Sequence, residues 1–259
     1  MRLGLARAGE ETRVAGLYQA GAGRVRFPKP AAGAPLEAVL LNTAGGLTGG
    51  DRMGVDVTLA AGCRATVTSA AAEKIYRSLE GDTEIRVGLD LGDNARLTWL
   101  PQPTILFDRA RLDRRTEVSM SAGATLLAVE LLIFGRTAMG EEINRGMVRD
   151  CWRLRRDGKL VFADTFLADG PIASTLDRGA TLDGARATAL VLYAAPDAAS
   201  RLDDVRALLL DAAGAAGAST WNDLLVVRAA ARDGRTLQKD LEPVMALLAG
   251  APLPRVWQC

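Results

Sequence analysis

The side chains that could do chemistry in this chain are carboxylates, lysines and tyrosines, because none of the 259 residues is a histidine. Without histidine, no Ser-His-Asp or Cys-His catalytic group and no imidazole-ligated zinc or nickel site can form, so most classes of enzyme are disfavoured. Carboxylates within or next to glycine-rich and apolar segments are therefore the candidates for metal binding. These carboxylates are Asp51, Glu73, Asp108, Glu130 and Glu141.

Three of these carboxylates also have an ordinary structural interpretation. Asp51 closes a glycine-rich segment, where it either accepts backbone N–H bonds in a turn or exposes its carboxylate. Glu73 either pairs with Arg77 on the same strand face or lines a polar passage. Glu130 interrupts an apolar run, so it either pairs with Arg136 or faces a water-filled space, because an unpaired buried charge is too costly.

The cysteines provide no second kind of metal site. Cys63, Cys151 and Cys259 are an odd, widely spaced set without a Cys-x-x-Cys pair, which predicts reduced thiols in a cytoplasmic protein. The apolar surroundings of Cys63 and Cys151 predict small buried side chains, whereas Cys259, the last residue, is expected to be exposed. The first residues also lack the apolar run of a signal peptide.

The elements that hold these side chains leave their own signals in the sequence. The first is two doubled glycines, Gly45-Gly46 and Gly49-Gly50. Four glycines in six residues indicate left-handed backbone, close chain approach or a ligand cradle. A phosphate cradle needs a helix directly after the glycines. Residues 51–59 instead alternate apolar with polar or small side chains, which predicts a strand and makes nucleotide binding improbable.

A strand–turn–strand pattern recurs along the chain. Its turns fall at residues 62, 94, 123, 158 and 184, with the last two copies weaker, and they are spaced by 32, 29, 35 and 26 residues. A period of about 30 residues predicts a mainly β fold built from stacked, solenoid-like strand units around one core. An ordinary antiparallel sandwich is the alternative.

The pattern changes near residue 197. Apolar spacing predicts a helix over 202–212 that ends near Gly214 or Gly217, a strand over 224–229 and a last helix over 237–248 with Pro243 as a kink. We expect residues 1–196 to form the β-rich core and residues 197–259 to pack on it within one continuous domain. The two helices either cover an open sheet edge or dock a partner.

The charge balance argues against nucleic acid and membrane partners, since 32 Lys and Arg residues meet 31 Asp and Glu residues. The longest apolar stretch, Leu126–Phe134, is too short to span a bilayer. Arginines cluster at positions 109–115 and 149–156, where we expect most of them to be solvated and some of them to face an acidic partner.

Four short blocks, in this order and spacing, resemble the urease accessory protein UreD family, also called UreH. They are Leu41–Arg52, Ala72–Ser78, Trp99–Asp108 and Phe134–Glu141, within a similarity that extends over about residues 24 to 180. Beyond the carboxylates, the positions that we carry over as a structural motif are Gly45, Gly46, Gly49, Gly50, Lys74, Tyr76, Arg77 and Arg136.

The resemblance implies a stacked β fold and a maturation factor that is not an enzyme. Proteins of that family bind apo-urease and the accessory proteins UreF and UreG, the second a GTPase, and help to place nickel in the urease active site. Because histidine and paired cysteines are absent, we expect no tightly bound cofactor and nickel only in transit, along a weak path lined by the five carboxylates. The alternatives are a carboxylate-dependent metal hydrolase and a structural, adhesin-like β-solenoid.

Overall fold

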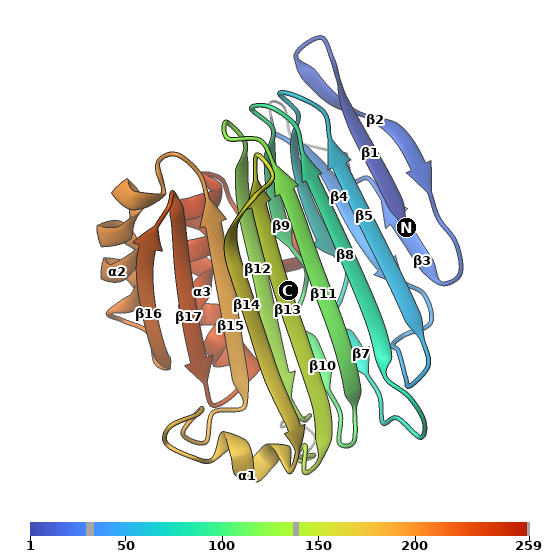
Figure 1. The fold of residues 1–259 in the computed structure, drawn as a ribbon, viewed down its shortest axis with the longest axis vertical. Helices are drawn as coiled ribbons and strands as arrows, with labels where there is room; N and C mark the ends of the chain where they lie inside the picture. The colour runs from blue at the N-terminus through green and yellow to red at the C-terminus, as the bar shows by residue number, and fades with distance from the viewer. Residues whose placement is uncertain (30–33, 137–139, 258–259) are drawn as a thin grey trace.

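Two β-sheets face each other in the computed structural model, which describes residues 1–29, 34–136 and 140–257 (Figure 1). In sheet order, the described strands of the first sheet are β14 (Lys159–Gly170), β13 (Gly146–Arg156), β11 (Arg111–Met120), β8 (Thr83–Leu91), β5 (Arg52–Leu59), β1 (Arg2–Ala8) and β2 (Glu11–Tyr18). Those of the second sheet are β16 (Ala215–Trp221), β17 (Leu224–Ala231), β15 (Ala187–Ala194), β12 (Thr125–Phe134), β9 (Arg96–Leu100), β6 (Arg64–Ser69), β4 (Leu36–Asn42) and β3 (Gly23–Arg26). The short strands β7 (Glu73–Ile75) and β10 (Thr104–Leu106) pair with each other, and β10 also pairs with β12.

The middle of both sheets is a parallel coil, as the repeated turns predict. The chain passes from β5 to β6, from β8 to β9 and from β11 to β12, and each of these steps crosses from the first sheet to the second. Within the first sheet, Val55 pairs with Val87 and Val87 with Thr116, so successive coils are offset by 32 and 29 residues. The stacked, solenoid-like β arrangement is therefore confirmed.

The solenoid ends earlier than the sequence pattern suggests. The turn at Asp157-Gly158 joins β13 to β14 as an antiparallel hairpin inside one sheet, and β15 then pairs antiparallel with β12. Asp157 and Gly158 both have positive φ, 48° and 77°, which is typical of the tight hairpin turn that reverses a strand on itself. The prediction that the turns at 158 and 184 continue the stacked coils is therefore wrong.

β12 is buried on both faces, which explains its nearly continuous apolar sequence. Leu126 and Ala128 point into the core between the sheets, whereas Leu127 and Val129 belong to a second core beneath α3 (Gly234–Ala249). By the same alternation, Glu130 lies on the face that points between the sheets. The strand therefore positions a carboxylate inside the main core.

The other helices are short: α1 (Ile172–Leu176), α2 (Leu202–Leu209), and the 3-10 turns η2 (Ala198–Arg201) and η3 (Arg255–Trp257). α2 ends before the predicted 212, because the Asp240 carboxylate accepts the N–H groups of Ala213 and Gly214 as the chain turns into β16. α3 starts three residues before the predicted 237, with Asp233 as its N-cap.

The C-terminal helices cover a sheet face rather than an edge. α3 contacts β12, β15 and β17, and β17 pairs with β15, so the second sheet continues across residue 197 (Figure 1). Pro243 lies inside α3. None of the helices among the described residues is both long and apolar enough to cross a membrane.

Candidate functional site

The doubled glycines let two loops approach closely. A side chain at Gly46 would overlap the ring of Tyr76, and one at Gly49 would overlap Ser78, so neither position can carry a Cβ in this packing. The Tyr76 hydroxyl donates to the Gly45 carbonyl at 3.1 Å, and backbone bonds join Leu47 to the strand that begins at Glu73. Gly46 and Gly49 therefore serve chain contact, whereas Gly45 and Gly50 stand in open space with positive φ, 78° and 86°.

Asp51 has the turn geometry that was its structural alternative. Its Oδ2 accepts the Thr48 N–H at 2.8 Å, which closes the turn that contains the second glycine pair. Thr48 in turn donates its hydroxyl to the Arg77 carbonyl at 3.0 Å. The carboxylate thus holds the glycine segment against the segment that follows β7.

A cavity of about 280 Å³ lies between the two sheets, beside β7 and β10 of the second sheet. Most of its wall is apolar and includes Leu40, Met53, Val55, Ile85, Val87 and Trp99. Four charged residues, Glu73, Lys74, Arg114 and Glu130, also line it. A mostly apolar cavity with a few charged groups is the usual form of a binding site.

Glu73 stands at this cavity with a neutral partner. Its Oε1 accepts the Asn42 amide at 3.0 Å, and no ion pair with Arg77 forms. Burial raises the pKa of Glu73, although the bond from Asn42 opposes that rise. Of the two interpretations offered by the sequence, the structure places Glu73 in a cavity wall and not in a Glu-Arg pair.

Glu130 belongs to a buried ionic cluster centred on Arg114. Arg114 donates Nε and Nη2 to the two Asp150 oxygens at 3.0 and 2.7 Å, and Nη1 to the Thr104 hydroxyl at 2.9 Å. The same Nη1 lies 2.5 Å from Glu130 Oε1. The Arg114, Asp150 and Glu130 side chains are only 5–6% exposed. The expected pairing of Glu130 with Arg136 is wrong.

The charges of this cluster do not balance if both carboxyl groups ionise. Burial raises the pKa of Glu130 to about 8; the guanidinium of Arg114 opposes the rise and the charge of Asp150 adds to it. Burial alone would lower the pKa of Arg114, but Asp150 and Glu130 outweigh that effect and raise it. Because burial raises the pKa of Glu130, a protonated Glu130 beside the Arg114–Asp150 ion pair leaves the cluster without net charge.

Arg114 and Asp150 were not predicted as site residues, because the arginine clusters were interpreted as solvated. The signal was present in strand alternation: Arg114 falls between the inward-facing Leu112 and Thr116, and Asp150 falls between Val148 and Trp152. A charge at an inward position of an alternating strand indicates a buried pair. Two such charges on neighbouring strands, β11 and β13, indicate that they meet.

Asp108 and Glu141 lie elsewhere, at an open surface hollow of about 430 Å³ that Tyr76 and Phe107 also border. Asp108 Oδ1 accepts the N–H groups of Asn144 and Arg145 at 2.7 and 3.1 Å. Glu141 pairs with Arg136, whose guanidinium stacks on the Phe107 ring at 4.5 Å. Both carboxylates are engaged in holding loops.

The five predicted carboxylates thus fall in three places: the glycine turn, the inner cavity and the surface hollow. Tyr76 links the last two, since it borders the hollow while its hydroxyl reaches Gly45 in the cavity wall. In the described ranges, no three His, Cys, Asp or Glu side chains converge as a metal site would require. Tight metal binding has no preformed site in this part of the chain.

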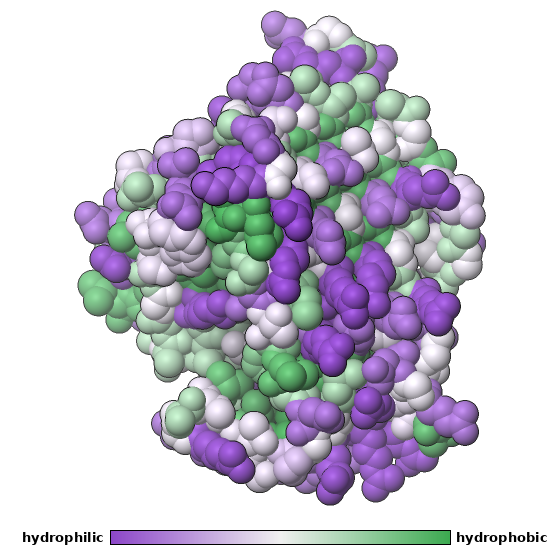
Figure 2. Space-filling view, viewed as in Figure 1, coloured by the Kyte–Doolittle hydropathy of each residue, from purple (hydrophilic) through white to green (hydrophobic). Residues whose placement is uncertain are grey.

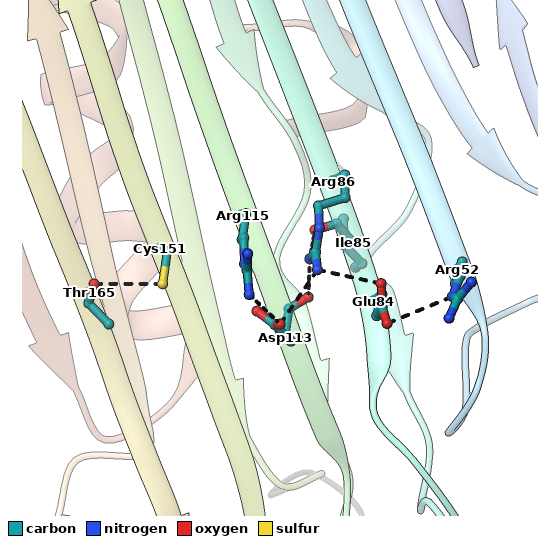
Figure 3. Close-up of polar contacts among 8 residues, drawn as sticks. All are labelled: Arg52, Glu84, Ile85, Arg86, Asp113, Arg115, Cys151 and Thr165. Atoms are coloured by element: carbon teal, nitrogen blue, oxygen red, sulfur yellow. Dashed lines mark hydrogen bonds and ion pairs between the residues drawn. The ribbon is translucent and has the colours of Figure 1, made fainter. Parts of the chain in front are cut away.

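Hydrophilic side chains gather on the outer face of the first sheet, beside hydrophobic patches on the same view (Figure 2). Arg86 lies 3.4 Å from Glu84 and 3.5 Å from Asp113, and the row continues to Arg52 and Arg115 (Figure 3). These side chains are exposed in part, as expected for most of the arginines. They form a solvent-facing counterpart to the buried cluster.

Two cysteines can be placed. Cys63 is fully buried, as predicted, and burial raises the pKa of its thiol. The prediction that Cys151 is buried is wrong. It lies half-buried on the outer face of β13, with its Sγ 3.6 Å from the Thr165 hydroxyl (Figure 3). Cys259 lies outside the described residues.

Comparison with known proteins covers nearly the whole chain. A family model described as UreD urease accessory protein matches residues 1–258. A urease accessory protein UreD from Methylobacterium sp. (strain 4-46) is 48% identical over 256 residues, which are 97% of this chain and 90% of the relative. Proteins of the same name from Rhizobium etli and Xanthobacter autotrophicus are 49% and 48% identical, covering 95% and 96% of this chain and 89% and 86% of their own lengths.

Proposed function

The chain belongs to the UreD family of urease accessory proteins, and from this premise we propose that it acts in urease maturation as an accessory protein and not as an enzyme. Its proposed partners are apo-urease and the accessory proteins UreF and UreG. Together they would carry out GTP-dependent insertion of nickel into the urease active site. Family membership over residues 1–258 supports this role.

Two kinds of contribution follow for this chain. As a scaffold, the chain presents the exposed faces of its two sheets to its partners. As a route it offers the cavity between the sheets, where Glu73 and Glu130 are the carboxylates in the wall. Nickel is cargo here, and carboxylate oxygens bind it weakly enough to release it.

The inner cavity is the single observation that carries the route. A divalent ion that passes through the cavity moves along an apolar wall that includes Met53, Val55 and Trp99. It needs polar groups at intervals, because an unpaired charge in an apolar space is too costly. Glu73, steadied by Asn42, is one such group, and the protonated carboxyl group of Glu130 beside Arg114 offers a second polar oxygen at another point of the wall. The surface hollow with Asp108 and Glu141 is the proposed mouth, and Tyr76 borders it while its hydroxyl reaches Gly45 of the cavity wall.

Deletion of this one gene from cells that carry the full urease cluster tests the role. We expect urease protein to accumulate without nickel and without activity, and both to return when the gene is restored. Unchanged nickel content and activity after deletion would contradict the proposed function. Turnover by the isolated chain would then be the next property to measure.

A further inference from the structure

The guanidinium of Arg114 sits in a cage of oxygen atoms from three other strands. Asp150 of β13 supplies two carboxylate oxygens at 2.7 and 3.0 Å, and Thr104 of β10 supplies a hydroxyl oxygen at 2.9 Å. Glu130 of β12 supplies a carboxyl oxygen at 2.5 Å. Carboxylate and hydroxyl oxygens gathered in this way are the donor set that Mg²⁺, Ca²⁺ and Mn²⁺ prefer in proteins, and they can also hold nickel.

The cage is part of the cavity wall and not a separate compartment. Thr104, Arg114 and Glu130 all line the cavity, so an ion inside it can approach the cage oxygens. Arg114 cannot withdraw, because its backbone is held in register between Ile85 of β8 and Asp150 of β13. The pairing of the strands therefore holds the Arg114 guanidinium in the cage.

We propose that Arg114 is a tethered cation that occupies this oxygen cage and so prevents a divalent metal ion in transit from being trapped there. The inference rests on the proposed nickel route. Without the guanidinium, Asp150 and Glu130 would be two buried carboxyl groups with no counter-ion, and a bound metal ion would offset the cost of ionising them. With the guanidinium in place, the cage is filled and a passing metal ion is not retained there.

The choice of arginine over lysine agrees with this role. A planar guanidinium makes two parallel bonds to Asp150 while a third nitrogen direction serves Thr104 and Glu130. An ammonium group is a single point charge and would leave part of the cage open. A purely structural ion cluster would also use this geometry, so the test must measure metal and not stability alone.

The test compares nickel binding by the purified full-length protein and its Arg114→Gln variant, with Ni²⁺ alone as the probe. We expect the variant to bind nickel on the order of tenfold or more tightly than the wild type, because the metal replaces the lost counter-ion. Ni²⁺ should also raise the melting temperature of the variant and leave that of the wild type unchanged. R114Q/D150N, which removes one carboxylate with the arginine, should keep only part of the gain.

Arg86→Gln is the matched control, because Arg86 also lies between a Glu and an Asp but on the exposed outer face (Figure 3). It should gain no nickel affinity. If R114Q does not fold with or without nickel, R114Q/E130Q takes over the measurement, since it leaves a single buried carboxylate and should still bind nickel more tightly than the wild type.

Equal nickel binding by wild type and by the variant that folds would overturn the inference. That outcome is separate from the gene deletion, because binding is measured on purified protein without urease. A nickel gain in R114Q together with normal urease activation in the deletion strain would instead retain the cage and reject the transport role.

Discussion

At the scale of single residues, Arg114 and the carboxyl groups around it govern the electrostatics of the core. Glu130 faces the cavity only because β12 alternates between two cores, and it lacks a full counter-charge because Asp150 holds Arg114 through two bonds. Strand alternation in the sequence contains this information for each residue separately. The meeting of β10, β11, β12 and β13 in one place does not follow from any local pattern, so the cluster itself was not predicted.

Glu130 should make stability depend on pH. Burial raises its pKa to about 8, whereas a carboxyl group in the unfolded chain has a pKa of about 4.3. Between these values the folded protein keeps a proton that the unfolded chain releases. The free energy of unfolding contributed by this group therefore falls as pH rises through the window, by at most about 1.4 kcal/mol per pH unit.

Urea unfolding of the wild type and of Glu130→Gln near pH 6 and pH 8.5 checks this expectation. The variant cannot ionise at this position, so it should lose less stability between the two values than the wild type does. Asp90→Asn, an exposed carboxylate on β8, is the control and should behave as the wild type. The same loss in Glu130→Gln as in the wild type would show that Glu130 is already ionised at the lower pH.

The contact between the glycine segment and β7 depends on Gly46. Its φ of 155° and the nearby Tyr76 ring both oppose a side chain. We expect Gly46→Ala to lower the free energy of unfolding by about 1–3 kcal/mol. Gly16→Ala, in open space on β2, should change it little, and equal urea midpoints for the two variants would refute this account.

At the scale of elements, the sequence predicts the parallel coils of the solenoid but not the position where the solenoid ends. Tight turns at 62, 94 and 123 recur with the spacing that the parallel register then shows. The turn at Asp157-Gly158 has the same spacing but a different backbone, with two successive residues at positive φ. Spacing alone cannot distinguish a step between sheets from a hairpin within one, whereas the Asp-Gly pair is a hairpin signal.

Helix α3 closes the second core, and its start depends on Asp233. The carboxylate accepts the Thr236 N–H at 2.8 Å, and this bond is the main reason that the pKa of Asp233 is lowered. Asp233→Ala should lower the free energy of unfolding by about 1 kcal/mol, while Asp233→Asn, which keeps an acceptor, should lower it less. Thermal unfolding of the two variants side by side measures the difference, and equal losses would contradict the cap.

At the scale of the whole molecule, two sheets enclose an apolar cavity with few charged groups, and the predicted carboxylates divide between that cavity and the surface loops. The family and the mainly β fold could be predicted from motif order and from the turn period. The separation of Asp51, Asp108 and Glu141 from the cavity could not, because each of these residues is held by backbone or ion-pair contacts formed only in the folded loops.

The most direct measurement is the nickel content of urease from cells in which this protein carries Glu73→Gln and Glu130→Gln. Both changes keep side-chain size and remove the carboxylates of the cavity, and Asp90→Asn serves as the surface control. The account predicts that urease nickel and activity fall while apo-urease, UreF and UreG still co-purify with the variant. Full nickel occupancy, or loss of the partners together with the nickel, would contradict a route through the cavity.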